Sequence, residues 1–194
     1  MNTKKTNIHV LTAAALMTAL VFAGSYIQFY IPTGIDNTRL HLGNVMCLLG
    51  ALLFGKTKGG LAAGLGSMIY DLTNPLYIST CWLTFIMKFA MAFICGIIAH
   101  PKKRAAGEKP SALYSTIGAA CGALGYVVLY LLKNYIENYL VLGMELEVVI
   151  AAMVTKGTVS LINAIISVPA ALLLAAALRP ALKSAGLGDK IGLA

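Results

Sequence analysis

The sequence predicts an all-α membrane protein with six transmembrane helices in a single domain, residues 1–194. Of the 194 residues, 59% are hydrophobic and 11% are charged, and the mean hydropathy is +0.81, far from the composition of soluble domains. Six apolar segments are separated by short polar breaks. The basic residues gather in these breaks, so the net charge of +8 indicates membrane orientation and not nucleic-acid binding.

The first apolar segment, His9–Ile31, has 23 residues. As a helix it would be about 34 Å long, enough to cross a hydrocarbon core of about 30 Å. Lys4 and Lys5 precede it, as in a signal peptide, but no small-residue cleavage site follows, so we expect it to remain as the first span. The polar stretch Pro32–Arg39 is expected to form a loop.

The second and third segments, Leu42–Phe54 and Gly59–Ile69, are expected to form a tight hairpin hinged at Gly55–Lys58. Their many glycines would weaken a soluble helix, whereas small residues let helices approach closely in lipid. Each segment is near or below the length needed to span a bilayer. A re-entrant hairpin that dips in from outside is therefore the alternative to two crossings.

The remaining three segments are longer. Thr80–Ala99 is the fourth predicted helix, and a basic loop follows it. The fifth begins near Ala112 and gives way to the polar stretch Lys133–Tyr139. The sixth runs from near Val148 towards Leu178, longer than one crossing needs, and Pro169 inside it predicts a kink.

The distribution of basic residues predicts the orientation. If all six segments cross, one side receives only Arg39 and Lys133 together with four acidic residues. This asymmetry places both termini in the cytoplasm and argues against a re-entrant hairpin, which would leave two lysines outside. The other, cytoplasmic side receives eleven of the fifteen basic residues: Lys4, Lys5, Lys56, Lys58, Lys102, Lys103, Arg104, Lys109, Arg179, Lys183 and Lys190.

Polar residues inside the apolar segments are candidates for a binding site, because such groups are costly in a bilayer. Lys88 and Lys156 each lie eight residues into a segment that enters from outside, about 12 Å below the outer end of the helix. Ser160 and Asn163 follow Lys156 at helical spacing and share its face. Further polar and aromatic residues cluster at the outer ends of other segments: Arg39, His41, Tyr70, Asp71, Asn74 and Trp82.

Together these residues predict an outward-facing pocket for a small polar ring compound, including an anionic one. Structural alternatives remain for each. Lys88 could form an ion pair with Asp71, and Lys156 could extend to the outer surface. The Ser160 and Asn163 face could bond across helices, Trp82 could belong to an interfacial aromatic belt, and His41 could be a hydrogen-bonding residue at a loop end.

The sequence contains no catalytic or metal-binding motif that we recognise. Its three histidines are far apart, and its four cysteines lie singly in or beside apolar segments, where they are expected to serve as small packing residues. No Walker motif is present, so the chain does not power transport through its own nucleotide site. We therefore expect neither a metal nor a cofactor.

Several short runs resemble the substrate-binding (S) components of energy-coupling factor (ECF) vitamin transporters. These runs are RLHLGN at 39–44, LLFG at 52–55, GGLAAGLGS at 59–67, YD at 70–71 and TFIMK at 84–88. The likeness covers the order of six segments over most of the chain and is most specific from residue 39 to residue 96. Asn44 stands where the family pattern often has an aspartate, so a role for that carboxylate does not transfer.

The resemblance implies a six-helix protein of the bacterial cytoplasmic membrane that captures a vitamin or its precursor from outside. It further implies association with a membrane coupling subunit and two cytoplasmic ATPases, and release of the ligand by toppling in the membrane. An AxxxA pattern on the first helix docks the coupling subunit in this family, and Ala15 and Ala19 fit it.

These observations predict a micronutrient-capturing subunit that does no chemistry itself. One alternative is a small intramembrane enzyme acting on lipid head groups through Lys88, Lys156 and His41, and another is a structural or assembly subunit. The sequence leaves the substrate open among riboflavin, pantothenate, folate, a pyrimidine or pyridoxine precursor and a queuosine precursor.

Overall fold

The computed structural model describes residues 8–33, 37–101 and 111–188. Among these residues, five helices are long and apolar enough to cross a membrane, so the chain is a multi-pass membrane protein. Two short strands, a 3₁₀ turn and a π-helical turn complete the elements. In chain order they are α1 (Ile8–Tyr26), β1 (Gln28–Pro32), β2 (Asn37–His41), α2 (Gly43–Leu72), η1 (Ile78–Thr80), α3 (Cys81–Ala99), α4 (Ala112–Tyr135), η2 (Ile136–Val141) and α5 (Leu146–Ser184).

Helix α2 is not straight, because it reverses direction at Gly55, which we call the α2 hinge. Gly55 has φ 74° and ψ −173°, a backbone conformation open in practice only to glycine. The Sγ of Cys47 lies 3.8 Å from the Oγ of Ser67, although twenty residues of straight helix would span about 30 Å. A Cβ added to Gly59 would lie 2.6 Å from the Cα of Ala51. The two halves of α2 therefore pack side by side, as the predicted hairpin requires.

The helix predicted over His9–Ile31 is wrong at its C-terminal end, because α1 ends at Tyr26. The next residues, rich in aromatic and β-branched side chains that favour strands, form β1, which pairs antiparallel with β2 so that Tyr30 faces Arg39. The segment expected to be a loop, Pro32–Arg39, thus contains strand residues at both ends, and its residues 34–36 lie outside the described part. The all-α prediction missed this β-hairpin.

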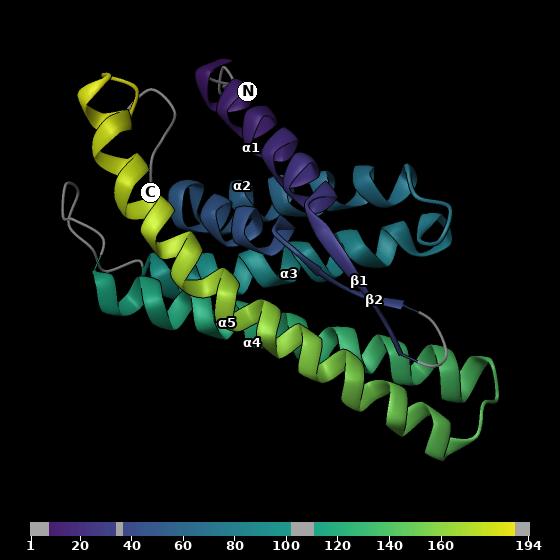
Figure 1. Cartoon of the computed structure of the whole chain (residues 1–194). Helices are drawn as coiled ribbons and strands as arrows, with labels where there is room; N and C mark the ends of the chain where they lie inside the picture. Colours follow the sequence, from purple (N-terminus) through teal and green to yellow (C-terminus); the bar gives the residue numbers. More distant parts are fainter. Residues whose placement is uncertain (1–7, 34–36, 102–110, 189–194) are drawn as a thin grey trace, which may run out of the picture.

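The last two helices are longer than predicted. The polar stretch Lys133–Tyr139 remains helical, since α4 continues into the π-helical turn η2. Helix α5 has 39 residues and contains both Pro169 and Pro180. Figure 1 shows α4 and α5 running alongside each other as a long diagonal pair.

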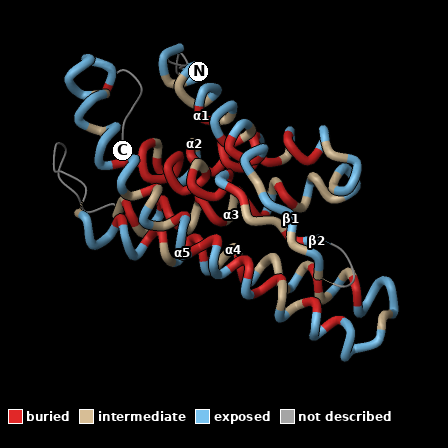
Figure 2. The backbone as a smooth tube through the Cα atoms, viewed as in Figure 1, coloured by how far each residue is buried: buried red, intermediate tan, exposed pale blue. Residues whose placement is uncertain are grey.

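The core lies around α2. Helix α2 packs against α1, α3 and α5, while α4 packs against α3 and α5. Small residues allow these helices to approach closely; a Cβ on Gly96 of α3 would lie 2.4 Å from the Cα of Lys56. In Figure 2 the buried residues concentrate along α2, and the outer faces of α1, α4 and α5 are exposed. Those exposed faces carry leucine, isoleucine and valine, as expected for surfaces that face lipid.

Candidate functional site

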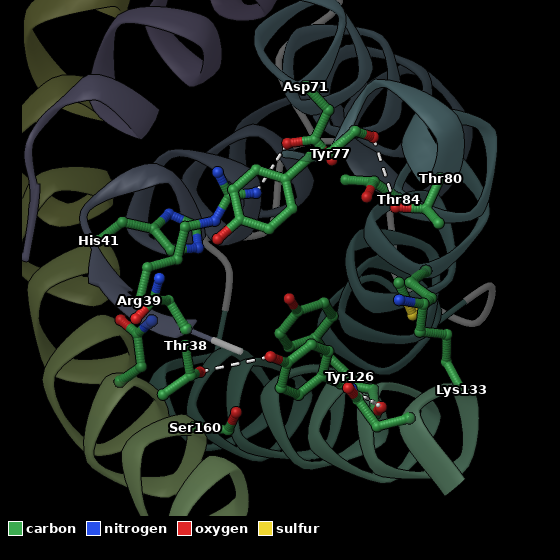
Figure 3. Close-up of a pocket in the computed structure, with 15 residues that line it drawn as sticks. Thr38, Arg39, His41, Asp71, Tyr77, Thr80, Thr84, Tyr126, Lys133 and Ser160 are labelled. Carbon is green, nitrogen blue, oxygen red and sulfur yellow. Dashed lines mark hydrogen bonds and ion pairs between the residues drawn. The ribbon is translucent and has the colours of Figure 1, made fainter. Parts of the chain in front are cut away.

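A polar cavity lies where the β-hairpin meets one end of the helices. Its cavity volume is about 70 Å³, and the cavity is partly open to solvent. Figure 3 shows side chains from β2, α2, α3, α4 and α5 arranged around this opening. The lining residues are Asn37, Thr38, Arg39, His41, Asp71, Tyr77, Thr80, Thr84, Met87, Tyr126, Tyr130, Lys133, Asn134, Ser160 and Asn163.

One wall of the cavity contains an ion pair. Arg39 Nη2 donates to Asp71 Oδ1 at 2.7 Å, and the Asp71 side chain is 1% exposed. The guanidinium carbon of Arg39 lies 4.8 Å from the centre of the Tyr70 ring and 4.1 Å from that of Tyr77. Stacking on aromatic faces stabilises a guanidinium and limits its rotation. The register of the β-hairpin and the end of α2 thus together hold a rigid charged pair against the cavity.

His41 lies beside this pair at the end of β2 and is buried. Burial lowers the pKa of His41 well below its ordinary value, and the positive charges of Lys88 and Arg39 lower it further. The ring is therefore neutral at neutral pH. Its Nδ1 accepts a hydrogen bond from the backbone N–H of Gly43 at 3.1 Å, so the proton sits on Nε2 and makes that atom a donor.

The opposite wall is aromatic and amide-rich. Tyr126 and Tyr130 of α4 stack with their ring centres 5.9 Å apart and their planes 11° apart. The hydroxyl of Tyr130 lies 3.3 Å from the Oγ1 of Thr38 on β2, which ties the β-hairpin to α4. Asn134 on α4 and Asn163 on α5 add buried amides to the lining. This wall offers flat apolar faces beside hydrogen-bonding groups.

The two predicted lysines lie behind the cavity surface. Lys88 donates to Asn44 Oδ1, and its ammonium lies 3.7 Å from the centre of the Tyr126 ring. Lys156 donates to Asn134 Oδ1. Both side chains are among the most buried in the described chain, and neither residue lines the cavity. They hold positive charge directly behind groups that do line it.

Five of the other residues predicted for the site do line the cavity. They are Arg39, His41, Asp71, Ser160 and Asn163. The ion pair of Lys88 with Asp71, considered above as a structural alternative, is not the pairing found, because Asp71 pairs with Arg39.

Three further residues predicted for the site lie outside the lining. Tyr70 is buried under Arg39. Asn74 donates to the hydroxyls of Tyr30 and Tyr70, at 3.2 and 3.4 Å. Trp82 is 57% exposed and is not part of the lining.

Helix α4 contributes site residues that were not predicted from the sequence. Tyr126, Tyr130 and Asn134 follow one another at a spacing of four residues, which places them on one helix face. That stripe of polar and aromatic residues in an apolar helix was a usable signal. Thr38, Thr84 and Met87 carried no comparable signal, because a threonine or methionine in an apolar chain is ordinary.

The predicted docking residues on α1 lie away from the cavity. Ala15 and Ala19 are exposed, whereas Met17 and Val21 on the other face of the helix are buried. Within the described residues, no group of three His, Cys, Asp or Glu side chains is placed to hold a metal ion. The site is therefore built from hydrogen-bonding, aromatic and charged side chains.

Comparison with known proteins agrees with this architecture. Residues 5–180 match the model of a family described as "ECF-type riboflavin transporter, S component". No curated protein matches the chain. Because the match covers most of the chain, and the chain has the apolar helices of a multi-pass membrane protein, the chain belongs to the S components of ECF-type transporters, membrane-embedded substrate-binding subunits for vitamin uptake.

Proposed function

We propose that this chain captures riboflavin, or a vitamin with a similar planar polar ring, at the outer face of the bacterial cytoplasmic membrane. The cavity that combines stacked tyrosines with buried hydrogen-bonding groups carries this proposal. A flavin ring is flat and apolar on its faces, with carbonyl and ring-nitrogen groups at its edges. Tyr126 and Tyr130 offer stacking surfaces for the faces. Asn134, Asn163 and Arg39 offer partners for the edges.

Buried charge favours a ligand that is anionic or electron-rich at its edge. Lys88 and Lys156 donate to the amide oxygens of Asn44 and Asn134, while Asp71 already neutralises Arg39. In a medium of low dielectric constant, two such ammonium groups would stabilise negative charge or carbonyl oxygens in the adjacent cavity. This supports an indirect role for both lysines in binding.

We further propose that the two halves of α2 cross the membrane separately, which makes six crossings with both termini in the cytoplasm. Arg179, near the end of α5, donates to the carbonyl of Leu52 at 2.6 Å, and His100 Nε2, just after α3, lies 3.2 Å from the same oxygen. The ends of α3 and α5 thus adjoin the α2 hinge, and Lys56 and Lys58 follow the hinge directly. This concentration of basic residues at one end supports its cytoplasmic location.

The partners follow from the family. We propose that the chain works with an ECF membrane coupling subunit and two ATPases, and that Ala15 and Ala19 form the surface that docks the coupling subunit. Both are exposed on α1, and small side chains permit a partner helix to pack closely. The ligand would then be released inward by a movement that ATP hydrolysis in the partners drives.

A binding experiment tests the proposed substrate. The purified chain in lipid nanodiscs should quench the fluorescence of added riboflavin in a saturable titration. Tyr126→Leu should weaken binding by about 2- to 10-fold, because an aromatic pair contributes about 0.5–1.5 kcal/mol beyond buried area. Tyr114→Leu is the matched control, since Tyr114 is an exposed tyrosine of α4 outside the cavity lining.

The outcome can contradict the proposal in two ways. Absence of saturable quenching, together with a co-purifying small molecule that mass spectrometry shows to lack a planar ring, would reject both riboflavin and its analogues. Equal losses in Tyr126→Leu and Tyr114→Leu would show that the aromatic wall on α4 is not the binding surface.

A further inference from the structure

The Arg39–Asp71 pair uses only part of its hydrogen-bonding capacity. Arg39 Nη2 and Asp71 Oδ1 make the contact at 2.7 Å. Arg39 Nη1 and Asp71 Oδ2 are both buried from solvent, and neither has a hydrogen-bond partner. A donor and an acceptor that belong to the same ion pair are thus both left without a hydrogen bond.

This arrangement is costly in a folded protein. Arginine and carboxylate commonly pair through two parallel bonds, and nearly all buried polar atoms find a partner. A buried donor or acceptor without one loses its hydration with no compensation. Both residues line the polar cavity, and Figure 3 shows their side chains at its edge, beside Tyr77. A ligand in the cavity would therefore lie against both residues.

The two atoms are also held in a fixed relation. The guanidinium is stacked against the Tyr70 and Tyr77 rings, and Asp71 is fixed on α2 with a nearly fully buried side chain. A ligand that matches them would not have to order either side chain on binding. Such preorganisation increases both affinity and selectivity.

We propose that Arg39 Nη1 and Asp71 Oδ2 recognise, by hydrogen bonds, a ligand edge on which a carbonyl oxygen lies beside an N–H group. Arg39 donates to the carbonyl, and Asp71 accepts from the N–H. The ligand class is then a ring containing a cyclic amide, imide or ureide. This inference rests on the proposed function, because riboflavin carries such an edge at its N3–H and neighbouring carbonyl.

Recognition by Arg39 Nη1 and Asp71 Oδ2 also predicts which ligands the site rejects. A ring whose edge nitrogen is alkylated, or which presents two acceptors there, leaves Asp71 Oδ2 unpaired or facing another oxygen. Sites that hydrogen-bond a substrate N–H discriminate strongly against analogues that lack it. Selectivity among vitamins would thus be set at this pair and not at the tyrosine wall, which accepts any flat ring.

The test compares riboflavin with N3-methylriboflavin on the parental protein in nanodiscs. The methyl group removes the only ring N–H of the oxidised flavin. We expect binding to weaken by about 10- to 100-fold, the loss for a hydrogen bond to a charged group. Equal affinity for the two flavins would overturn the inference and leave the riboflavin proposal standing. Because no variant is needed, misfolding cannot obscure this result.

A variant then assigns the effect to Asp71. Asp71→Asn keeps the size and one acceptor oxygen for Arg39 but places an amide donor where Oδ2 was. Riboflavin binding should fall about 10- to 100-fold in this variant, while binding of N3-methylriboflavin changes little, so that discrimination collapses. The control is Glu147→Gln, because Glu147 is an exposed acid at the start of α5. This variant removes the same charge away from the cavity and should leave both affinities unchanged. Discrimination that persists in Asp71→Asn would overturn the inference.

If the parental protein binds neither flavin, the riboflavin proposal fails and a second probe pair tests the edge itself. Uracil carries the same carbonyl and N–H edge, whereas 1,3-dimethyluracil has no N–H. Binding of uracil in preference to its dimethyl derivative would support recognition of this edge by Arg39 and Asp71, even though riboflavin is not the ligand. Equal binding, or none, would overturn it.

Discussion

Replacing Gly55 by alanine should destabilise the protein through the α2 hinge. Gly55 has φ 74° and ψ −173°, a region that is strained for any residue with a Cβ. The hinge is also confined by its neighbours, because the backbone of Gly55 and Lys56 lies against Gly96 of α3. The chain therefore has little room to move to another conformation that suits alanine.

The magnitude follows from the backbone strain. A residue held in a sparsely populated region costs about 1–3 kcal/mol, and the lower entropy of an unfolded chain with alanine does not offset this where φ is positive. We expect the free energy of unfolding to fall by about 1–3 kcal/mol. Flavin binding by the fraction that remains folded should be nearly unchanged, because Gly55 lies outside the cavity lining.

Reversible chemical unfolding in micelles measures the change, and Gly157→Ala is the control. A Cβ on Gly157 would have its nearest neighbour, Leu131 Cδ1, at 3.6 Å, which is ordinary van der Waals contact. Alanine there should stabilise helix α5 by up to about 1 kcal/mol. If Gly55→Ala proved as stable as Gly157→Ala, the positive-φ hinge would be refuted as the cause of the reversal in α2.

Three further predictions concern topology, charge and coupling. In a background without native cysteines, Lys58→Cys should be labelled from the cytoplasmic side only and Glu145→Cys from outside only; outside labelling at position 58 would contradict six crossings. Because the folded protein keeps His41 neutral, the unfolded chain binds more protons below about pH 6.5, so this residue lowers stability as the pH falls, by up to about 1.4 kcal/mol per pH unit. His41→Asn, which keeps an acceptor for the same backbone N–H, should flatten thermal stability between pH 7 and pH 5, and an unchanged slope would exclude His41 as the cause. Ala15→Leu combined with Ala19→Leu should keep ligand affinity in the isolated protein but abolish uptake and co-purification with a coupling subunit; uptake at the parental rate would reject this docking surface.

Local sequence features were enough to predict the membrane class and the α2 hairpin. Composition alone distinguishes a lipid-embedded chain from a soluble one, and a glycine and two lysines between two short apolar segments indicate a reversal. The AxxxA pair on α1 could likewise be recognised from the sequence, since two residues four positions apart share a face of any helix. Whether that surface docks a partner stays a prediction.

The β-hairpin and the make-up of the cavity were decided by tertiary structure. Strand pairing between β1 and β2 joins the end of a segment predicted to be helical to residues at the end of the predicted loop, and neither segment alone specifies that pairing. Whether Asp71 pairs with Arg39 or with Lys88 depends on how the end of α2 is rotated relative to β2 and α3. Lys88 and Lys156 donate hydrogen bonds to asparagine side chains. These amides come to lie opposite the lysines only when α2, α3, α4 and α5 have packed together. A single helix determines which of its residues share a face, but the partner of a buried polar group is set by the angle and register at which separate helices meet.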